Sequence, residues 1–384
     1  MEDLGMTMSL FDGVYRGSRV LLTGHTGFKG SWLALWLAEL GAEVHGYALA
    51  PPTDPSLFEA AGVRDVLASH RIADVRDHAA LQQCMQQVRP DMVFHLAAQP
   101  LVRLSYSEPR ETYETNVMGT VNLLEAVRQC DAVRVCQIIT SDKCYENHEW
   151  VYAYRENDPM GGYDPYSNSK GCAELVVSAY RQSYFNPQDV QRHGVSLATA
   201  RAGNVIGGGD WAEDRIIPDC MRALSRGETI QVRNPHAIRP WQHVLEPLSG
   251  YLWLAACQWR QPGGFEGAWN FGPTGAGNID VRRIVEQVVA AWGEGGWTAP
   301  ESDSDALHEA NFLKLDITKA SSLLGWGPVC TVPEAVSDTV AWYRAYDKES
   351  VDDVRGFTLG QIAAYVARAQ RCGQPWATTA GEQH

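Results

Sequence analysis

Residues 140–147 read TSDKCYEN and place a hydroxyl, a carboxylate and an amine in consecutive positions, at Ser141, Asp142 and Lys143. The apolar run just before them, VCQIIT, predicts a buried strand that ends at this point. A proton donor held beside a proton acceptor at a strand end can serve acid–base catalysis. A solvated turn, or an inert ion pair between Asp142 and Lys143, would explain the same residues.

A second pair of reactive residues follows about 25 positions later, where Tyr166 and Lys170 are spaced four apart. A helix over 165–184 would place both on one face. The lysine ammonium, together with a nicotinamide cation, would lower the tyrosine pKa from its usual value of about 10. The tyrosinate could then take a proton from an alcohol as hydride leaves for NAD. The same spacing also occurs in helices that carry no such function.

The segment TGHTGFKG (23–30) spaces Gly24, Gly27 and Gly30 three apart, between the first predicted strand and the first predicted helix. Glycines at such a junction let the backbone turn tightly and approach a pyrophosphate, which then lies at the helix N-terminus. The alternative is an ordinary glycine-rich turn. In an alternating fold this position predicts dinucleotide binding.

The residue that would select NAD is missing from its usual place. An acidic side chain is expected about 20 residues after the glycine loop, but residues 49–54 read LAPPTD, with no acid before Asp54. NADP is therefore not excluded. Asp74, at the end of the third predicted strand, could accept a hydrogen bond from the adenine amino group, or could cap the helix predicted at 78–88.

Strands and helices alternate through the first half of the chain. The predicted strands are 20–22, 43–49, 71–75, 91–98, 133–140 and 195–206, and the predicted helices are 31–41, 78–88, 109–129 and 165–184. This alternation predicts an α/β fold with a doubly wound, parallel, Rossmann-type sheet. Such sheets bind ligands at the carboxyl ends of their strands, where the polar residues described above fall.

The pattern changes after residue 206, where Gly, Pro and Trp become frequent and helices are predicted at 216–227, 280–293 and 332–346. We therefore expect a dinucleotide-binding domain over 15–206, to which segments around 240–272 return. Residues 207–346 would form mainly a smaller substrate-binding lobe. Residues 347–384 would form a C-terminal tail.

The composition excludes several classes of protein. The 384 residues carry a net charge of −14, which gives no general attraction for nucleic acid or for an anionic membrane surface. No run approaches the roughly 18 apolar residues of a membrane span, and the acidic start lacks the features of a secretory signal. The nine cysteines include no C-x-x-C pair, so we expect reduced thiols and no metal site. A cytoplasmic location is expected.

These residues together resemble a known family. The glycine trio, HLAAQ (95–99), Asn116, Ser141 and the Tyr166–Lys170 pair resemble an extended short-chain dehydrogenase/reductase over about residues 15–346. Nucleotide-sugar 4,6-dehydratases of that superfamily place an acid and a second acid–base group after the hydroxyl residue. A lysine in the last place, within GHTGFKGSWL, SDKCYEN and RAGNVIGGGDW, resembles the branch that acts on CDP-glucose.

The resemblance implies an NAD-dependent hydro-lyase that converts CDP-D-glucose to CDP-4-dehydro-6-deoxy-D-glucose, working as a homodimer or a dimer of dimers. It implies that Tyr166 is the base toward the sugar 4-hydroxyl, with Ser141 bonded to the same oxygen. Asp142 would be the acid toward the 6-hydroxyl and Lys143 the base toward C5, although which of the two carries which proton is open. A 4-epimerase or reductase on the same scaffold is the alternative, but it would not need the Asp142–Lys143 pair. A non-catalytic NAD-binding protein is a further alternative.

The resemblance also supplies the remaining candidate residues. The expected cofactor-binding residues are Gly24, Thr26, Gly27, Phe28, Gly30, Asp74, Val75, Leu96, Ala97, Ala98, Gln99, Asn116, Tyr166 and Lys170. The expected substrate-binding residues are Asn204, Arg215, Arg233 and Arg239. Arginine suits a diphosphate because its planar fork donates two parallel hydrogen bonds. Arg215 and Arg233 are equally well explained as solvated surface residues, and no residue chemistry selects cytosine.

Overall fold

The computed structural model describes residues 10–299, 313–347 and 353–378. Its centre is a sheet of seven strands in the order β11-β6-β5-β4-β1-β2-β3, with every neighbouring pair parallel. The strands are β1 (Arg19–Thr23), β2 (Glu43–Ala48), β3 (Ser69–Ile72), β4 (Met92–His95), β5 (Val135–Ile139), β6 (Ser196–Ala202) and β11 (Gly267–Phe271). The direction of winding reverses between β1 and β4, which is where such sheets bind ligands. The predicted doubly wound α/β fold is confirmed.

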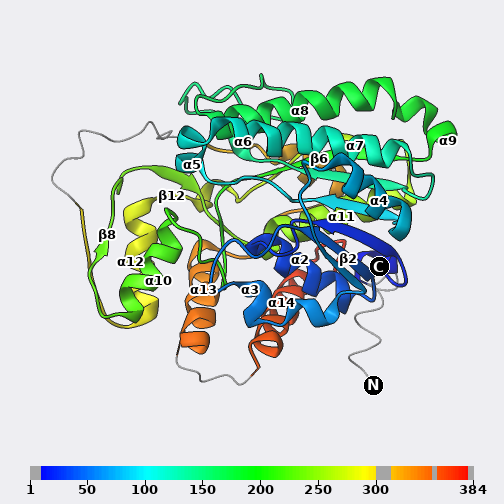
Figure 1. The fold of residues 1–384 in the computed structure, drawn as a ribbon. Helices are drawn as coiled ribbons and strands as arrows, with labels where there is room; N and C mark the ends of the chain where they lie inside the picture. The colour runs from blue at the N-terminus through cyan, green and yellow to red at the C-terminus, as the bar shows by residue number, and fades with distance from the viewer. Residues whose placement is uncertain (1–9, 300–312, 348–352, 379–384) are drawn as a thin grey trace.

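Helices cover both faces of the sheet (Figure 1). In β1, Leu21 points to one face and its neighbours Val20 and Leu22 to the other, as the two-residue repeat of a strand requires. The face of Leu21 is covered by α4 (His78–Val88), α7 (Gly119–Arg128) and α8 (Pro165–Ser183). The opposite face is covered by α2 (Phe28–Glu39) and α11 (Leu245–Arg260), which pack with α14 (Val354–Arg371).

The remaining elements are shorter or belong to a smaller group beside the sheet. In Figure 1 this group lies to the left, with β8 outermost, α10 and α12 beside it, and α13 nearer the sheet. Its helices are α10 (Ile216–Ser225), α12 (Val281–Trp292) and α13 (Val332–Asp347). Short strand pairs connect it: β7 (Val205–Ile206) with β10 (Gln242–His243), β9 (Ile238–Pro240) with β12 (Asn278–Asp280), and β8 (Ile230–Gln231) with β13 (Trp297–Thr298). Short helices on the main sheet are α3 (Leu57–Ala60), α5 (Val102–Ser107), α6 (Pro109–Tyr113) and α9 (Val190–His193).

Two predicted elements are interrupted. The helix expected at 109–129 is divided by a π-helical turn, η3 (Glu114–Met118), which separates α6 from α7. Such turns frequently mark functional positions, and this one contains Asn116, whose side chain is bonded outside its own helix. The strand expected at 195–206 divides at Gly203 and Asn204 into β6 and β7.

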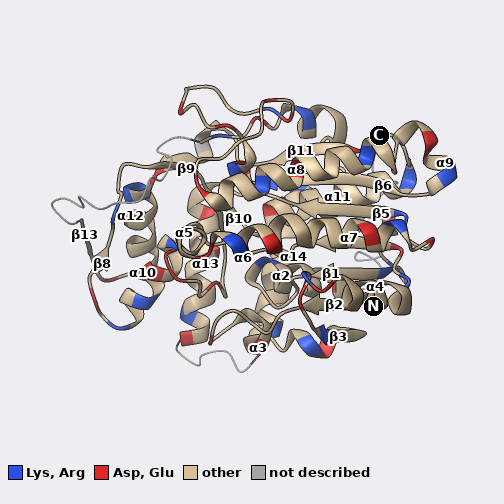
Figure 2. Cartoon of the chain, turned by 45° about the horizontal axis from the view of Figure 1, so that its top comes forward, with Lys and Arg blue, Asp and Glu red and all other residues tan. Residues whose placement is uncertain are grey.

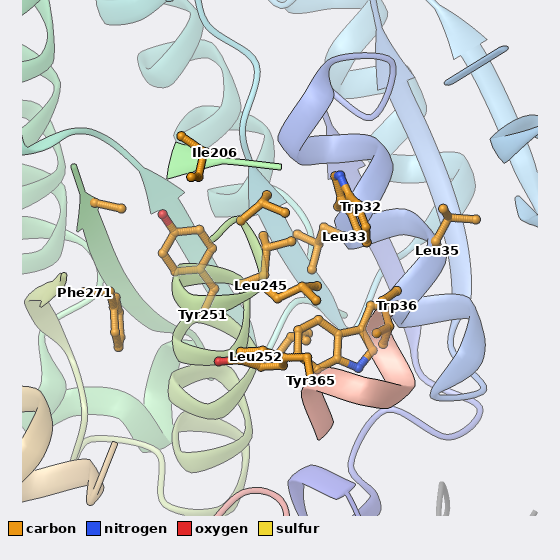
Figure 3. Packing of buried hydrophobic residues seen from close by; sticks show 14 of the residues in the cluster. Trp32, Leu33, Leu35, Trp36, Ile206, Leu245, Tyr251, Leu252, Phe271 and Tyr365 are labelled. Atoms are coloured by element: carbon orange, nitrogen blue, oxygen red, sulfur yellow. The ribbon is translucent and has the colours of Figure 1, made fainter. Parts of the chain in front are cut away.

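The C-terminal segment contributes to the core. The prediction of a tail assigned no element there, but α14 places Tyr365 against Trp36 of α2 with ring centroids 5.9 Å apart. Figure 3 shows these rings beside Leu252 of α11. The rings of Trp36 and Tyr365 are almost fully buried, and burying one large apolar side chain stabilises a fold by about 1.5–3 kcal/mol. Removing α14 would therefore expose the outer side of α2.

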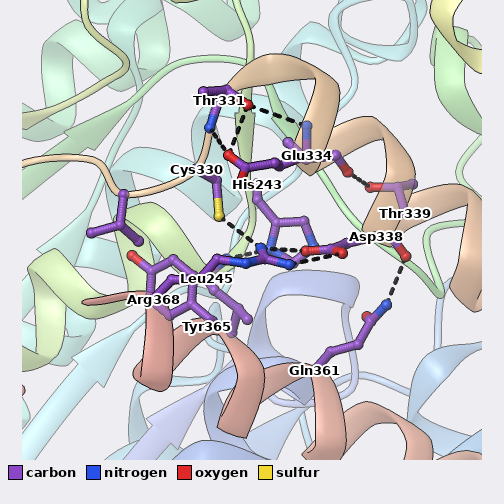
Figure 4. Close-up of polar contacts among 12 residues, drawn as sticks. His243, Leu245, Cys330, Thr331, Glu334, Asp338, Thr339, Gln361, Tyr365 and Arg368 are labelled. Carbon is purple, nitrogen blue, oxygen red and sulfur yellow. Dashed lines mark hydrogen bonds and ion pairs between the residues drawn. The ribbon is translucent and has the colours of Figure 1, made fainter. Parts of the chain in front are cut away.

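Polar contacts also fix α14 in place (Figure 4). Arg368 of α14 forms an ion pair with Asp338 of α13 at 2.6 Å. Tyr365 donates a hydrogen bond of 2.8 Å to Glu246 of α11, which also accepts one of 2.6 Å from the backbone N–H of Cys330. Burial raises the pKa of Glu246 to about 7, against the effect of these hydrogen bonds. Three helices distant in sequence are thus joined through one carboxyl group and one ion pair.

The surface carries both signs of charge. Figure 2 shows acidic and basic positions interspersed along the helices, although Asp and Glu exceed Lys and Arg by 46 to 32 over the chain. Within the described residues, no helix combines the length and apolar character that crossing a bilayer requires. The nine cysteines are free thiols, and most of them are buried.

Candidate active site

A cleft of about 1540 Å³ opens along the carboxyl ends of the central strands and is closed on one side by the smaller group of elements. Of the residues predicted to bind cofactor, it is lined by Gly24, Thr26, Gly27, Phe28, Gly30, Asp74, Val75, Leu96, Ala97, Ala98, Tyr166 and Lys170. The other predicted residues that line it are Ser141, Asp142, Lys143, Asn204, Arg215, Arg233 and Arg239. The structure therefore brings nearly all candidate residues to one cavity.

The glycine loop forms the floor of the cleft between β1 and α2. Gly24 has a φ of +76°, and a Cβ atom there would lie 2.7 Å from the backbone nitrogen of Ala97. A Cβ atom on Gly30 would overlap the carbonyl group of Gly24. Gly27 begins α2 without a side-chain cap, and the nearest atom to a Cβ there lies 3.5 Å away. The uncapped backbone N–H groups of the first turn can therefore receive a phosphate.

Asp74 lines the cleft and does not have the helix-capping role that was the alternative for it. Its carboxylate accepts hydrogen bonds of 2.8 Å from both the backbone and the side chain of Arg76. The helix cap that we had considered for Asp74 is instead Asp77, which accepts from the backbone N–H of Ala80. Arg76 holds the pKa of Asp74 below its usual value, although burial acts in the opposite direction. Asp74 is therefore a charged acceptor at the edge of the cleft.

Gln99 and Asn116 are the two predicted cofactor residues that do not line the cleft within the described part of the chain. The Asn116 carboxamide accepts from the backbone N–H of Gln99 at 2.8 Å and donates to its carbonyl at 3.0 Å. It also donates to Ser169 of α8 at 2.9 Å. The Gln99 side chain donates to Thr112 at 2.8 Å. These amides fix the segment after β4 against the helix that carries Tyr166 and Lys170.

The Ser141–Asp142–Lys143 cluster follows directly after β5. Ser141 begins a short 3₁₀ turn, η4 (Asp142–Cys144), and its hydroxyl accepts the backbone N–H of Lys143 at 3.2 Å. The same hydroxyl donates a hydrogen bond of 3.0 Å to Oδ1 of Asp142. Ser141 and Asp142 are buried, whereas Lys143 is partly exposed on the cleft wall. The turn therefore directs all three residues into the cavity.

The environment of Asp142 favours its neutral form. Burial raises the pKa of Asp142, while Lys143, the Ser141 hydroxyl and Arg239 oppose the rise. Its Oδ2 atom is buried and has no hydrogen-bond partner among the described residues. A buried, unpaired carboxylate oxygen is costly, and protonation removes that cost. A neutral Asp142 can donate a proton, as the acid role requires.

Gly203 makes this arrangement possible, which yields a testable prediction. A Cβ atom at this position would lie 2.9 Å from Oδ2 of Asp142 and 2.5 Å from Cγ of Pro240. Gly203→Ala should therefore displace the Asp142 carboxyl group and lower kcat by about ten-fold or more, while cofactor affinity stays unchanged. Steady-state kinetics and cofactor titration measure the two quantities. Unaltered kcat would show that the position of this carboxyl group is unimportant.

Tyr166 and Lys170 lie one turn apart on α8, and both are buried. Burial raises the pKa of Tyr166 to about 12, and a hydrogen bond with Ser141 and the charge of Arg215 only partly oppose this. Burial lowers the pKa of Lys170 to about 8, against the attraction of Glu174. The protein's own groups thus do not produce the lowered tyrosine pKa that we expected. A further positive charge beside the phenol is needed to favour the phenolate.

A buried ion pair beneath the site was not anticipated from the sequence. Glu174, one turn after Lys170, pairs with Arg201 of β6 at 2.7 Å, and both side chains are almost fully buried. Glu174 also accepts hydrogen bonds from Thr199 at 2.8 Å and from Thr140, the residue before Ser141. Burial alone would raise the pKa of Glu174, but Arg201 and these hydrogen bonds hold it below its usual value. The pair joins α8 to the ends of β5 and β6.

Lys29 is a second residue to which sequence analysis assigned no role. It lines the cleft, with its Nζ atom 5.7 Å from the ring centroid of Tyr251. Burial lowers the pKa of Lys29 to about 8, and repulsion from Arg215 and Lys170 adds to the effect. Attraction to Asp142 opposes it. A signal was present in the sequence, because Lys29 is the one basic residue in the largely apolar segment FKGSWLALWLAE.

The predicted substrate residues line the part of the cleft formed by the smaller group of elements. Arg215 forms an ion pair with Asp210 at 2.8 Å, and Arg233 pairs with Asp214 at 2.6 Å. Arg239 is buried and donates a hydrogen bond of 3.0 Å to the carbonyl of Ile238. Asn204 connects β7 to β10, where its carbonyl accepts from the backbone of Gln242 at 3.1 Å. Two of the three arginines are thus paired with aspartates that line the same cleft, so a bound anion would compete with those carboxylates.

Comparisons with known proteins agree with this geometry. A family model described as GDP-mannose 4,6 dehydratase matches residues 21–339. A CDP-glucose 4,6-dehydratase of Salmonella typhimurium (strain LT2) is 54% identical over 357 residues, which are 93% of this chain and 98% of that protein.

Solved structures share the fold. A dTDP-glucose 4,6-dehydratase from Bacillus anthracis in complex with NAD matches with a TM-score of 0.71 at 19% identity, covering 86% of this chain and 98% of that one. A UDP-glucose 4-epimerase from Thermotoga maritima with UDP-glucose matches with a TM-score of 0.71 at 22% identity, covering 85% and 99%. The fold alone would not decide between a dehydratase and an epimerase. The family match and the 54% identity over almost the whole chain do decide it. The chain belongs to the nucleotide-sugar 4,6-dehydratases, enzymes of the extended short-chain dehydrogenase/reductase superfamily.

Proposed function

We propose that this enzyme is a hydro-lyase that converts CDP-D-glucose to CDP-4-dehydro-6-deoxy-D-glucose and water, with tightly held NAD. The observation that carries the proposal is the position of Asp142, Lys143 and Tyr166 on the wall of one cleft. An elimination needs an acid and a base in addition to the redox residues, and this pair supplies them. The Salmonella relative, at 54% identity, supports CDP-glucose as the substrate.

The cofactor role rests on the fit of the cleft. The tight Gly24–Gly30 loop and the uncapped first turn of α2 suit a pyrophosphate, and Asp74 suits a hydrogen-bond donor of the adenine. The solved dehydratase structure with NAD favours NAD over NADP. Bound NAD would supply the redox chemistry by accepting hydride from sugar C4 and returning it to C6. Its cationic ring would also add the positive charge that Tyr166 needs to become a phenolate.

The residues act in a fixed order. Tyr166, as phenolate, takes the proton of the 4-hydroxyl as hydride leaves C4, and Ser141 donates a hydrogen bond to the same oxygen. The new C4 ketone acidifies the proton on C5. Lys143, uncharged, then removes that proton, and neutral Asp142 protonates the 6-hydroxyl as the C6–O bond breaks and water leaves. Lys143 finally returns its proton to C5 when hydride reaches C6.

Binding of the nucleotide sugar falls to the other wall of the cleft. Arg239 and Asn204, with Arg215 and Arg233, surround the space where a diphosphate would lie. Residues 15–206 and the returning segments around 240–272 would then hold the cofactor, and residues 207–346 mainly the sugar nucleotide. Arginine pairs with phosphate through two parallel hydrogen bonds, so these side chains can exchange Asp partners for phosphate oxygens.

Assembly as a homodimer or a dimer of dimers is part of the same proposal. The segment after β4 and helix α8 expose the apolar side chains of Tyr113, Met118 and Leu175. Exposed apolar groups on neighbouring helices are typical of a contact between subunits. Light scattering during size-exclusion chromatography measures the mass, and a mass of one chain would contradict the proposal.

An isotope experiment tests the proposed reaction. The enzyme is supplied with CDP-glucose deuterated at C4 and with catalytic NAD, and the product is analysed by mass spectrometry and NMR. A 4-keto-6-deoxy sugar with deuterium at C6 is expected, because the hydride is returned within one active site. A 4-epimer that keeps its 6-hydroxyl would instead establish the epimerase alternative. Loss of deuterium to solvent would contradict the internal transfer.

A further inference from the structure

The proposed reaction leaves two residues in the wrong protonation state after each turnover. Tyr166 has gained the proton of the 4-hydroxyl, and the product keeps a ketone at C4, so that proton is not returned to the sugar. Asp142 has given its proton to the departing water. Lys143 is unchanged, since it takes and returns one proton at C5. A proton must therefore pass from Tyr166 to Asp142 before the next substrate can react.

The Ser141 hydroxyl lies between the two residues on the wall of the cleft. Its Oγ atom donates to Oδ1 of Asp142 at 3.0 Å. The same hydroxyl is close enough to the Tyr166 phenol to lower its pKa by hydrogen bonding. A hydroxyl has one proton to donate and two lone pairs that accept. The backbone N–H of Lys143, at 3.2 Å, occupies one lone pair and fixes the position of Oγ. The other lone pair is left for the phenolic proton.

Burial limits the other routes for this proton. Ser141, Asp142 and Tyr166 retain relative exposures of 7%, 3% and 9%. Oδ2 of Asp142 is buried and has no hydrogen-bond partner among the described residues, and Ser141 is the hydroxyl that donates to Oδ1 of this carboxyl group, beside the backbone N–H of Lys143. Hydrogen bonds in a low-dielectric site polarise one another, which favours transfer along a chain of them.

We propose that Ser141 is a proton relay that resets the enzyme after each turnover, in addition to its hydrogen bond with the sugar oxygen. The Tyr166 O–H bond breaks as its proton passes to Ser141 Oγ, and the Ser141 proton passes to Oδ1 of Asp142. Tyr166 becomes phenolate, Asp142 becomes a neutral acid, and Ser141 ends as a hydroxyl. The relay consumes no oxidant or external acid. It rests on the proposed function, because an epimerase would return the tyrosine proton to the sugar.

Rapid-quench kinetics with CDP-glucose and the NAD-loaded enzyme separates the first turnover from later ones. Ser141→Ala also lacks the hydrogen bond to the sugar oxygen, so its first turnover should be slower than that of the wild type. It should still form about one product per active site and then continue at least ten-fold more slowly than in that first turnover, because the reset now depends on solvent. Ser141→Thr, which keeps a hydroxyl, should show no such burst. A small proton carrier such as imidazole should accelerate the later turnovers of Ser141→Ala without changing the first.

The outcomes decide between the two roles of Ser141. If the first and the later turnovers of Ser141→Ala slow by the same factor, or if both are lost, the relay would be overturned. Ser141 would then act only through its hydrogen bond to the sugar. If Ser141→Ala does not fold by circular dichroism, Ser141→Gly carries the same comparison. Failure of the proposed function is distinguishable, because the wild-type enzyme would then form no 4-keto-6-deoxy sugar even in the first turnover.

Discussion

Lys143→Met should give an enzyme that reduces its bound NAD when CDP-glucose is added but forms product at least a hundred-fold more slowly than the wild type. Tyr166, Ser141 and Lys170 remain, so hydride can still leave C4. The C5 proton then has no base, and a positioned acid or base contributes about 10²- to 10⁴-fold to such a step. Absorbance at the NADH maximum follows the first step, and NMR of the sugar follows the loss of water.

The matched control for this variant is Tyr166→Phe. It lacks the phenol that takes the 4-hydroxyl proton, so it should reduce no NAD and form no product. Both variants would then be severely impaired in turnover, but only Lys143→Met would show NADH absorbance. Normal turnover by Lys143→Met would show that another group removes the C5 proton. Lys29, which lines the same cleft and whose pKa burial lowers to about 8, would then be the candidate.

The fold was largely predictable because its signals are local. Each strand at the centre of a parallel sheet is apolar on both faces, and a glycine loop or a polar cluster marks where it ends. The cluster at Ser141–Lys143 and the glycines at 24–30 could therefore be placed at one edge before their distances were known. The structure confirms the doubly wound sheet on which this placement depended.

The parts that could not be predicted depend on contacts between distant segments. Helix α14 is stabilised by Trp36 and Glu246, far away in sequence, and its own pattern carries little information. The π turn at Asn116 follows from bonds to Gln99 and Ser169, which lie outside its helix. No spacing rule connects such partners, so they become visible only in three dimensions.

The pKa of Tyr166 could also not be predicted from the sequence, because it depends on which segments bury the phenol. The Tyr166–Lys170 spacing indicates a cation near the phenol, but it carries no information about burial. In the structure burial is the largest effect on both residues and moves their pKa values apart, raising that of Tyr166 to about 12 and lowering that of Lys170 to about 8. Burial therefore opposes the charged form of both groups, and the charge of the bound cofactor would supply the attraction that the phenolate needs.

Glu174→Gln should lower the free energy of unfolding by about 3 kcal/mol or more, because it leaves the Arg201 guanidinium buried without its counter-charge. Urea denaturation at pH 7 measures the change. The matched control is Glu125→Gln, which removes the partner of Arg128 on the surface of α7 and should cost less than about 1 kcal/mol, since Arg128 can be solvated. Equal effects of the two variants would contradict a structural role for the buried pair.

The pH dependence of the same variant gives an independent check. The fold holds the pKa of Glu174 below its usual 4.5, so its carboxylate stabilises the protein above that pH and this contribution is lost as the pH falls further. The difference in unfolding free energy between wild type and Glu174→Gln should therefore become smaller at acidic pH.

The same variant should also affect catalysis. Because Glu174 accepts a hydrogen bond from Thr140, next to Ser141, Glu174→Gln should lower kcat even where the protein remains folded. A stable but fully active variant would mean that the catalytic cluster is positioned by β5 and η4 alone.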